Sequence, residues 1–146
     1  MKLNLFRILQ STKNSVAKIS SHIGKELYRT EIASPGGNTL IADEPIESGG
    51  QNSGLSPTEL LAASLAACTS VTLRMYADRK GWDLAAINTH VELTRDEALN
   101  KTAITRNIQL IGNLDGTQTA RLLVIANSCP VHKILSNPIE IKTKLI

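Results

Sequence analysis

A long apolar helical pattern occupies the middle of this chain, with a clear start signal and a clear stop signal. Ser56 precedes Pro57 and is followed three residues later by Glu59, which is the pattern of a capping box with proline at the first helical position. Gly81 supplies the stop signal. A helix of this length extends about 36 Å at about 1.5 Å per residue. Because that distance spans a small domain, we expect the helix to lie at the centre of the fold.

One face of this helix predicts how it packs. Residues at helical spacing on that face are Leu61, Leu65, Cys68, Thr72 and Met75. The chain of 146 residues holds only one Trp, two Tyr and one Phe, so its core must consist of Leu, Ile, Val and Ala. This length is typical of one domain. We expect a single domain over residues 16–146, preceded by an N-terminal arm at residues 1–15.

The strand patterns occur in runs on either side of the long helix. Pro35-Gly36-Gly37-Asn38 is a hairpin signal between two apolar runs. Asp115 is placed to cap a second helix that ends near Asn127, and Pro130 begins a short helical turn. Runs of strands, rather than alternating strands and helices, predict an α+β fold with antiparallel pairing. The expected strands are 16–23, 27–33, 39–43, 87–95, 102–111 and 139–146.

The charge pattern argues against several classes of protein. The net charge is +3, and no run of Lys and Arg interleaved with aromatic residues suggests a nucleic-acid surface. The sequence has no stretch of 18 apolar residues and no apolar core of a signal peptide, so we expect neither a membrane span nor secretion. Two cysteines in a chain of this size are not a disulfide scaffold, so we expect a cytoplasmic protein.

The two cysteines occupy different local settings. Cys68 lies deep in the long helical pattern, where a cysteine is by default a small buried hydrophobe. Cys129 comes just before Pro130, at the start of a short helix, where free N–H groups favour a thiolate, and His132 follows it. Their spacing fits no metal motif. If they act together, the fold must bring them together.

Two segments carry a resemblance to a known family. The segment 53–73, which contains Ser56-Pro57-Thr58-Glu59 and ends Ala66-Ala67-Cys68-Thr69-Ser70-Val71-Thr72-Leu73, is followed by Tyr76-Ala77-Asp78-Arg79-Lys80-Gly81-Trp82. It resembles the central helix of the OsmC/Ohr family, the osmotically inducible and organic-hydroperoxide-resistance proteins. Cys129-Pro130-Val131-His132-Lys133 is similar to the second cysteine motif of that family. The similarity extends from about Ile23 to the C-terminus. It implies the OsmC-like fold, with antiparallel sheets around a long central helix and a second helix, and an intertwined homodimer with active sites at the subunit interface.

The resemblance also implies a chemistry for the two thiols. Cys68 would attack the O–O bond of an organic hydroperoxide, and its sulfenic acid would condense with Cys129 to a disulfide. A dithiol, typically carried by a lipoyl group in this family, would reduce that disulfide by exchange. The reaction requires no metal, flavin or haem. It requires an apolar pocket for the organic part of the substrate.

The activating residues implied by the family are a Glu and an Arg. In the hydroperoxide reductases that Glu lies ten residues before the helix cysteine, where this chain has Thr58; Glu59 is one step further along. Glu59 is the candidate for this role, and completing the capping box is its alternative role. Arg29 is the candidate for the arginine, as the only one between Arg7 and the helix. Two other interpretations stay open: a non-enzymatic OsmC-like dimer that binds a small apolar or thiol-reactive molecule or senses oxidation, and a domain in which both thiols are inert.

Overall fold

The computed structural model describes residues 16–146, and the N-terminal arm predicted at residues 1–15 lies outside this range. The chain forms two compact units that meet in sequence between Ser56 and Pro57. Each unit has its own sheet, and each is described separately below.

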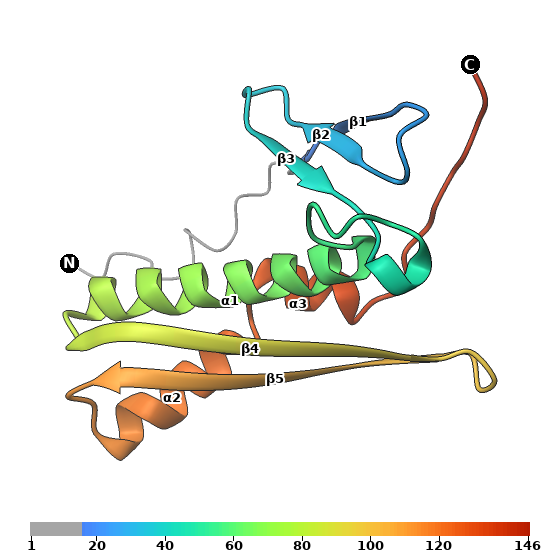
Figure 1. Ribbon diagram of the computed structural model, residues 1–146. Coiled ribbons are helices and arrows are strands. Elements are labelled where there is room, and N and C mark those ends of the chain that lie inside the picture. Colours follow the sequence, from blue (N-terminus) through green and yellow to red (C-terminus); the bar gives the residue numbers. More distant parts are fainter. Residues whose placement is uncertain (1–15) are drawn as a thin grey trace. The chain divides into compact units, whose positions relative to one another are not determined.

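The first unit contains a three-stranded antiparallel sheet in the order β1-β2-β3 (Figure 1). The strands are β1 (Ser20–Ile23), β2 (Thr30–Ala33) and β3 (Thr39–Ala42), and a short 3-10 helix follows at Ile46–Ser48. The hairpin predicted at residues 35–38 is confirmed, since β2 pairs with β3 across it. The predicted second strand is too long at its start, because Tyr28 has a left-handed backbone with φ of 55° that interrupts an extended run.

The loop after β3 folds around a single carboxylate. Asp43 is buried, and its side chain accepts hydrogen bonds from the backbone N–H groups of Glu44, Gln51 and Ser53 at 2.8, 3.2 and 3.0 Å. The Ser53 hydroxyl adds a fourth bond at 2.7 Å. The loop turns so tightly that a Cβ at Gly50 would lie 2.0 Å from the Glu44 carbonyl oxygen. Glycine is therefore required at that position.

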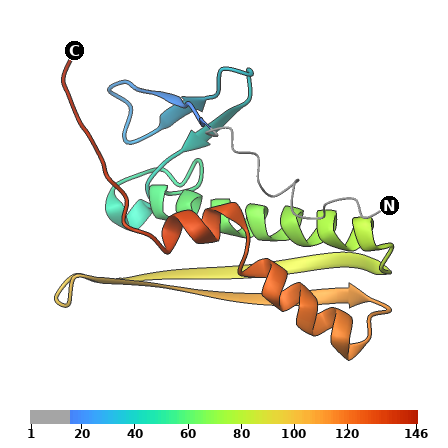
Figure 2. The same ribbon diagram turned by 180° about the vertical axis from the view of Figure 1, so that it is seen from behind.

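The second unit combines one long helix with a long hairpin and two shorter helices. The predicted long helix is confirmed as α1 (Pro57–Lys80), and it ends at Gly81, whose φ of 65° is left-handed. Figures 1 and 2 show α1 lying along the β4–β5 hairpin. The predicted pair of strands is confirmed and is longer than expected, as β4 (Leu84–Asp96) and β5 (Lys101–Gly112).

The last two helices begin where the sequence predicts. Asp115 caps α2 (Gly116–Ala126) through a capping box with Gln118, whose backbone N–H donates to the carboxylate at 2.8 Å. Pro130 then begins α3 (Pro130–Leu135), with Cys129 at the N-cap. Both α2 and α3 contact α1.

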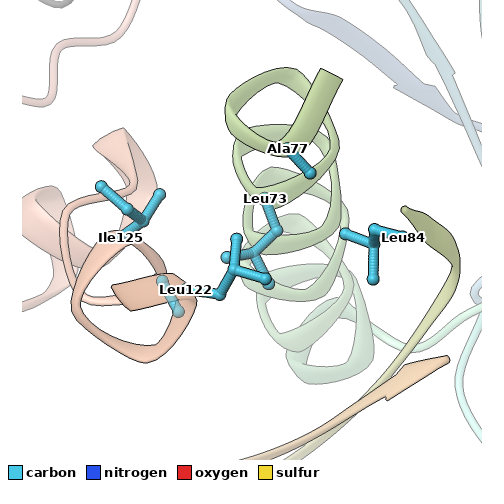
Figure 3. Packing of buried hydrophobic residues seen from close by; sticks show 6 residues of the cluster. Leu73, Ala77, Leu84, Leu122 and Ile125 are labelled. Atoms are coloured by element: carbon cyan, nitrogen blue, oxygen red, sulfur yellow. The ribbon is translucent and has the colours of Figure 1, made fainter. Parts of the chain in front are cut away.

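The core of this unit lies where α1, α2 and the start of β4 meet. Leu73 of α1 and Leu122 of α2 are each 1% exposed, and Figure 3 shows their side chains pointing toward one another. The tightly packed cluster is completed by Ala77, Leu84, Ile125 and Ala126. The core is therefore aliphatic, as the shortage of aromatic residues predicts.

The buried face of α1 differs from the predicted one. The buried residues are Leu65, Thr69, Leu73 and Ala77, whereas Met75 is 54% exposed. Apolar residues occur on several faces of this helix, so spacing alone does not select the face that packs. By length and composition alone α1 could also cross a membrane, but its buried stripe contacts α2 and β4 as a core helix does.

The strand predicted at residues 139–146 is wrong. These residues have no regular secondary structure and pair with neither sheet among the described residues. Ile141 and Leu145 are 83% and 99% exposed. An alternating pattern forms a strand only where a partner strand supplies hydrogen bonds and a surface to pack on, and this segment has neither among residues 16–146.

Candidate functional site: two thiols beside a buried threonine

The second unit brings Cys68 and Cys129 together. Both are free thiols; Cys68 is half-buried on α1 and Cys129 is fully buried. The Cys129 side chain is among the neighbouring groups that act on the Cys68 thiol. The two sulfur atoms therefore lie close together, although sixty residues separate them in the sequence.

The turn between α2 and α3 positions Cys129. α2 ends at Ala126, and after a two-residue turn Cys129 becomes the N-cap of α3 with Pro130 at the first helical position. The backbone N–H of His132 donates a hydrogen bond to the Cys129 sulfur at 3.3 Å. The proline fixes the chain direction there, because its φ suits the first turn of a helix and it needs no hydrogen-bond acceptor.

The surroundings of Cys68 do not favour its thiolate. Burial raises the pKa of Cys68, and the hydrogen bond and charge of Cys129 raise it further. The backbone N–H of Val131 and the hydroxyl of Thr72 act in the opposite direction, but the net direction is upward. Within this unit, Cys68 is therefore placed for attack but is not activated by a neighbouring charge.

Sequence reasoning missed a polar cluster next to the thiols. The Arg106 guanidinium on β5 donates to the Thr69 hydroxyl at 2.8 Å and to the side-chain oxygen of Asn127 at 2.9 Å. Thr69 is fully buried, and its oxygen lies 2.7 Å from the Leu65 carbonyl oxygen and 3.9 Å from the Cys129 sulfur. The cluster therefore links strand β5 to the buried thiol through one hydroxyl group.

A signal for Arg106 is present in the sequence. Residues 104, 106, 108 and 110 face the same side of β5 and are half-buried, while their neighbours are exposed. Three of these four residues are Ile or Leu, so a charged residue in this register indicates a buried polar partner. That partner is Thr69.

A pocket of about 480 Å³ in this unit borders the cluster of Arg106 and Asn127. Its walls are mixed: Leu65 of α1 and Ile104 of β5 are among the apolar side chains, and Arg106 and His132 are among the polar ones. Neither cysteine is among its described lining residues, so the pocket borders the Arg106 cluster and not the sulfur atoms. The remaining lining residues are Leu61, Thr102, Ile108, Leu123, Asn127, Leu135 and Ser136.

The two predicted activating residues lie elsewhere in the chain. Glu59 is in the first turn of α1, about 13 Å along the helix from Cys68 at about 1.5 Å per residue. It cannot reach Cys68 within one straight helix, so an activating role would need an intervening group. Arg29 belongs to the first unit, where its guanidinium forms an ion pair with Glu31 at 2.8 Å. Their proposed roles toward Cys68 stay predictions.

Metal ligands do not gather in the described part of the chain. Among residues 16–146, no group of three His, Cys, Asp or Glu side chains is arranged to hold a metal ion.

Comparison with known proteins identifies the family. Residues 50–144 match the family model described as OsmC-like protein, and the chain belongs to this family. A search of curated proteins finds no match. The predicted α+β, OsmC-like fold is thereby confirmed.

Solved structures agree with this assignment. An OsmC-like protein from Mycoplasma pneumoniae is similar with a TM-score of 0.72 and 17% identity, over 84% of this chain and 89% of that chain. A proposed osmotic stress induced and detoxification response protein from Psychrobacter arcticus 273-4 gives 0.71 and 24%, over 83% and 89%. The organic hydroperoxide resistance protein OhrB of Bacillus subtilis gives 0.57 and 25%, over 82% and 90%. Some structural neighbours are thus organic hydroperoxide resistance proteins.

Proposed function

We propose that this protein is a thiol-dependent peroxidase that reduces organic hydroperoxides. The observation that carries the proposal is the neighbouring position of Cys68 and Cys129 in a chain of the OsmC-like family. Two free thiols that interact across a fold, one accessible and one buried, suit an attacking and a resolving cysteine. Structural neighbours that are organic hydroperoxide resistance proteins support the substrate class.

The proposed reaction has three steps. The Cys68 thiolate attacks the terminal peroxide oxygen and breaks the O–O bond, so that Cys68 becomes a sulfenic acid. The other oxygen leaves as an alkoxide and takes up a proton to give the alcohol. The Cys129 thiol displaces water from that sulfur and forms a disulfide. A cytoplasmic dithiol, such as a lipoyl group, then supplies two electrons and is itself oxidised to a disulfide.

The test is peroxide consumption by the purified protein with a dithiol reductant. With cumene hydroperoxide and dihydrolipoamide, we expect many turnovers by the natural protein and none by Cys68→Ser. Cys129→Ser should accumulate a sulfenic acid at Cys68 that dimedone traps. Met75→Leu is the matched control, because Met75 is an exposed sulfur on the same helix that can be oxidised only once. Turnover that survives Cys68→Ser contradicts the mechanism.

A homodimer is part of this proposal. α1 and α2 carry exposed apolar side chains that the other described residues leave uncovered, among them Val71, Met75 and Leu123, each more than half exposed. Exposed apolar side chains of this kind favour association with a second copy. Analytical ultracentrifugation should find a dimer, and a monomer at all accessible concentrations would contradict this part.

One observation favours a second, non-enzymatic function. Burial raises the pKa of Cys68, which disfavours the thiolate that attack on a peroxide requires. A thiol pair without an activating charge suits a protein that binds a small apolar or thiol-reactive molecule or senses oxidation. A single stoichiometric oxidation without repeated turnover, in the same assay, would favour this function over the peroxidase.

A further inference from the structure

We infer that Arg106, acting through Thr69, stabilises the Cys129 thiolate, so that Cys129 is the leaving group when an external dithiol reduces the Cys68–Cys129 disulfide. Arg106 is a positioning residue in this scheme, since it contacts neither sulfur directly. The inference rests on the proposed function, because it concerns the last step of that reaction.

The hydrogen bonds around Thr69 explain how the influence of Arg106 reaches the sulfur. A threonine hydroxyl has one proton to donate and two lone pairs that accept. Arg106 fills one lone pair at 2.8 Å, which leaves the proton to be shared between the Leu65 carbonyl oxygen at 2.7 Å and the Cys129 sulfur at 3.9 Å. When Cys129 carries a negative charge, the proton turns toward it without movement of the heavier atoms. A hydroxyl that is already polarised by a cation donates more strongly.

The charge of Arg106 has no competing carboxylate. Its guanidinium donates to two neutral oxygens, those of Thr69 and Asn127, and within the described residues no acidic side chain lies within salt-bridge distance of it. The cation is therefore available to a thiolate in the same cluster. Among residues 16–146, ionisable groups near Cys129 include Cys68 of α1 and His132 of α3, whose backbone N–H already donates to the Cys129 sulfur.

Burial determines which sulfur an incoming thiol reaches. Cys129 is completely buried, whereas Cys68 is half-buried. An external thiolate therefore attacks Cys68 and forms a mixed disulfide there. The Cys68–Cys129 bond breaks, and its electron pair leaves on Cys129 as the thiolate that Thr69 and the His132 N–H stabilise. The second thiol of the dithiol then closes on the first, releases the Cys68 thiolate and carries away the disulfide.

The first experiment locates the mixed disulfide in the natural protein. The protein is oxidised with diamide, treated briefly with 2-mercaptoethanol, quenched in acid and mapped by peptide mass spectrometry. We expect the adduct on Cys68 and a free thiol at Cys129. An adduct mainly on Cys129 overturns the inference.

The second experiment measures the Cys129 thiolate without any peroxide chemistry. In the Cys68→Ser background Cys129 is the only thiol, and its thiolate absorbs near 240 nm. We expect Arg106→Met to lower the thiolate fraction at a given pH severalfold, less than the loss of a charge within about 4–6 Å would, because Arg106 acts through Thr69. Arg106→Lys, which keeps the charge, should recover much of the loss.

A further pair of variants distinguishes the effect of the Thr69 hydroxyl from a general change in the structure. Thr69→Val removes the hydroxyl and should lower the thiolate fraction as Arg106→Met does, while Thr69→Ser keeps the hydroxyl and should not. Equal thiolate titrations in all folded variants overturn the inference, even if peroxide turnover is normal. Conversely, the expected titrations together with no peroxide turnover would support the role of Arg106 and contradict the peroxidase.

Discussion

Two neighbouring leucines on α2 offer a direct test of the packing described above. Leu122 is 1% exposed between α2 and α1, whereas Leu123 is 61% exposed on the same helix. Leu122→Ala removes three buried carbon atoms, worth about 2.4 kcal/mol at about 0.8 kcal/mol each, and leaves a cavity as well. We expect a loss of about 3 kcal/mol in the free energy of unfolding. The corresponding fall in Tm is roughly 6–12 °C for a chain of this size.

Leu123→Ala is the matched control. It makes the same chemical change at the next position along the same helix, so the cost in helix propensity is the same for both variants and cancels in the comparison. Its exposed side chain should cost only about 0.5 kcal/mol in an isolated chain. If a second copy covers α2, as the proposed homodimer requires, the cost of Leu123→Ala should grow with protein concentration, whereas the cost of Leu122→Ala should not.

Urea denaturation measures both costs. Far-UV circular dichroism follows the whole chain, and the fluorescence of Trp82, the only tryptophan, follows the core cluster against which its ring packs. The two variants are compared at several protein concentrations. If Leu122→Ala costs no more than Leu123→Ala at the lowest concentration, the assignment of this core is wrong.

Three other predictions follow from the described contacts. A thiol reagent should label Cys68 of the native protein before Cys129, because Cys129 is completely buried. The labelling rate of Cys68 should continue to rise at higher pH than that of a free thiol, because burial raises the pKa of Cys68. Peptide mapping after timed quenching measures the order, and the reverse order would contradict this prediction. Thr69→Val should cost about 1–3 kcal/mol of unfolding free energy, and its effect should not add to that of Arg106→Met, since both break one contact; full additivity in a double-mutant cycle would argue against the contact. Hydrogen bonds, first that of the Ser53 hydroxyl, lower the pKa of Asp43, so its carboxylate stabilises the fold above its ordinary value of 3.8 and this contribution disappears as the pH falls through the lower folded value. Asp43→Asn should therefore flatten the acid limb of the stability curve measured by urea denaturation, and an unchanged limb would contradict the role of Asp43.

The elements that the sequence predicted correctly are those specified by local signals. Pro57 and Gly81 mark the ends of α1, and Asp115 with Gln118 marks the start of α2. Each signal satisfies backbone groups at a helix end, so it works with little help from distant residues. The β4–β5 hairpin was predicted for a related reason, since two adjacent runs with alternating apolar residues can pair directly.

The elements that were missed depend on partners far along the chain. The alternation in residues 139–146 is as regular as that of β5, yet β5 has β4 beside it and the C-terminal segment pairs with no described strand. The buried face of α1 likewise depends on where α2 packs, because Leu122 selects Leu73 and leaves Met75 exposed. Local patterns indicate which side chains of an element could be buried, and only the tertiary structure determines which of them are buried.

Some residues of the candidate site were likewise predicted from the sequence and others were missed. The resemblance to the OsmC family indicated Cys68 and Cys129, and the structure places them together. Arg106 was missed although its register on β5 made it visible, because a lone charge in an apolar stripe has no meaning until its partner is known. Thr69 was missed for the opposite reason, since a threonine beside a cysteine in a helix attracts no attention until it is found completely buried.

Solvent access and polar contacts belong to different sulfur atoms in this unit. Cys68 can be reached from outside, but its burial raises its pKa and opposes the thiolate that attack on a peroxide requires. Cys129 cannot be reached, but it receives the His132 N–H and faces a hydroxyl held by a cation. Charge stabilisation at an inaccessible sulfur cannot speed its attack on a substrate in solution, whereas it does make that sulfur a better leaving group. Under the proposed mechanism, the polar cluster would therefore act on the regeneration of the reduced protein, and the rate of peroxide attack would depend on whatever further charge is brought to Cys68.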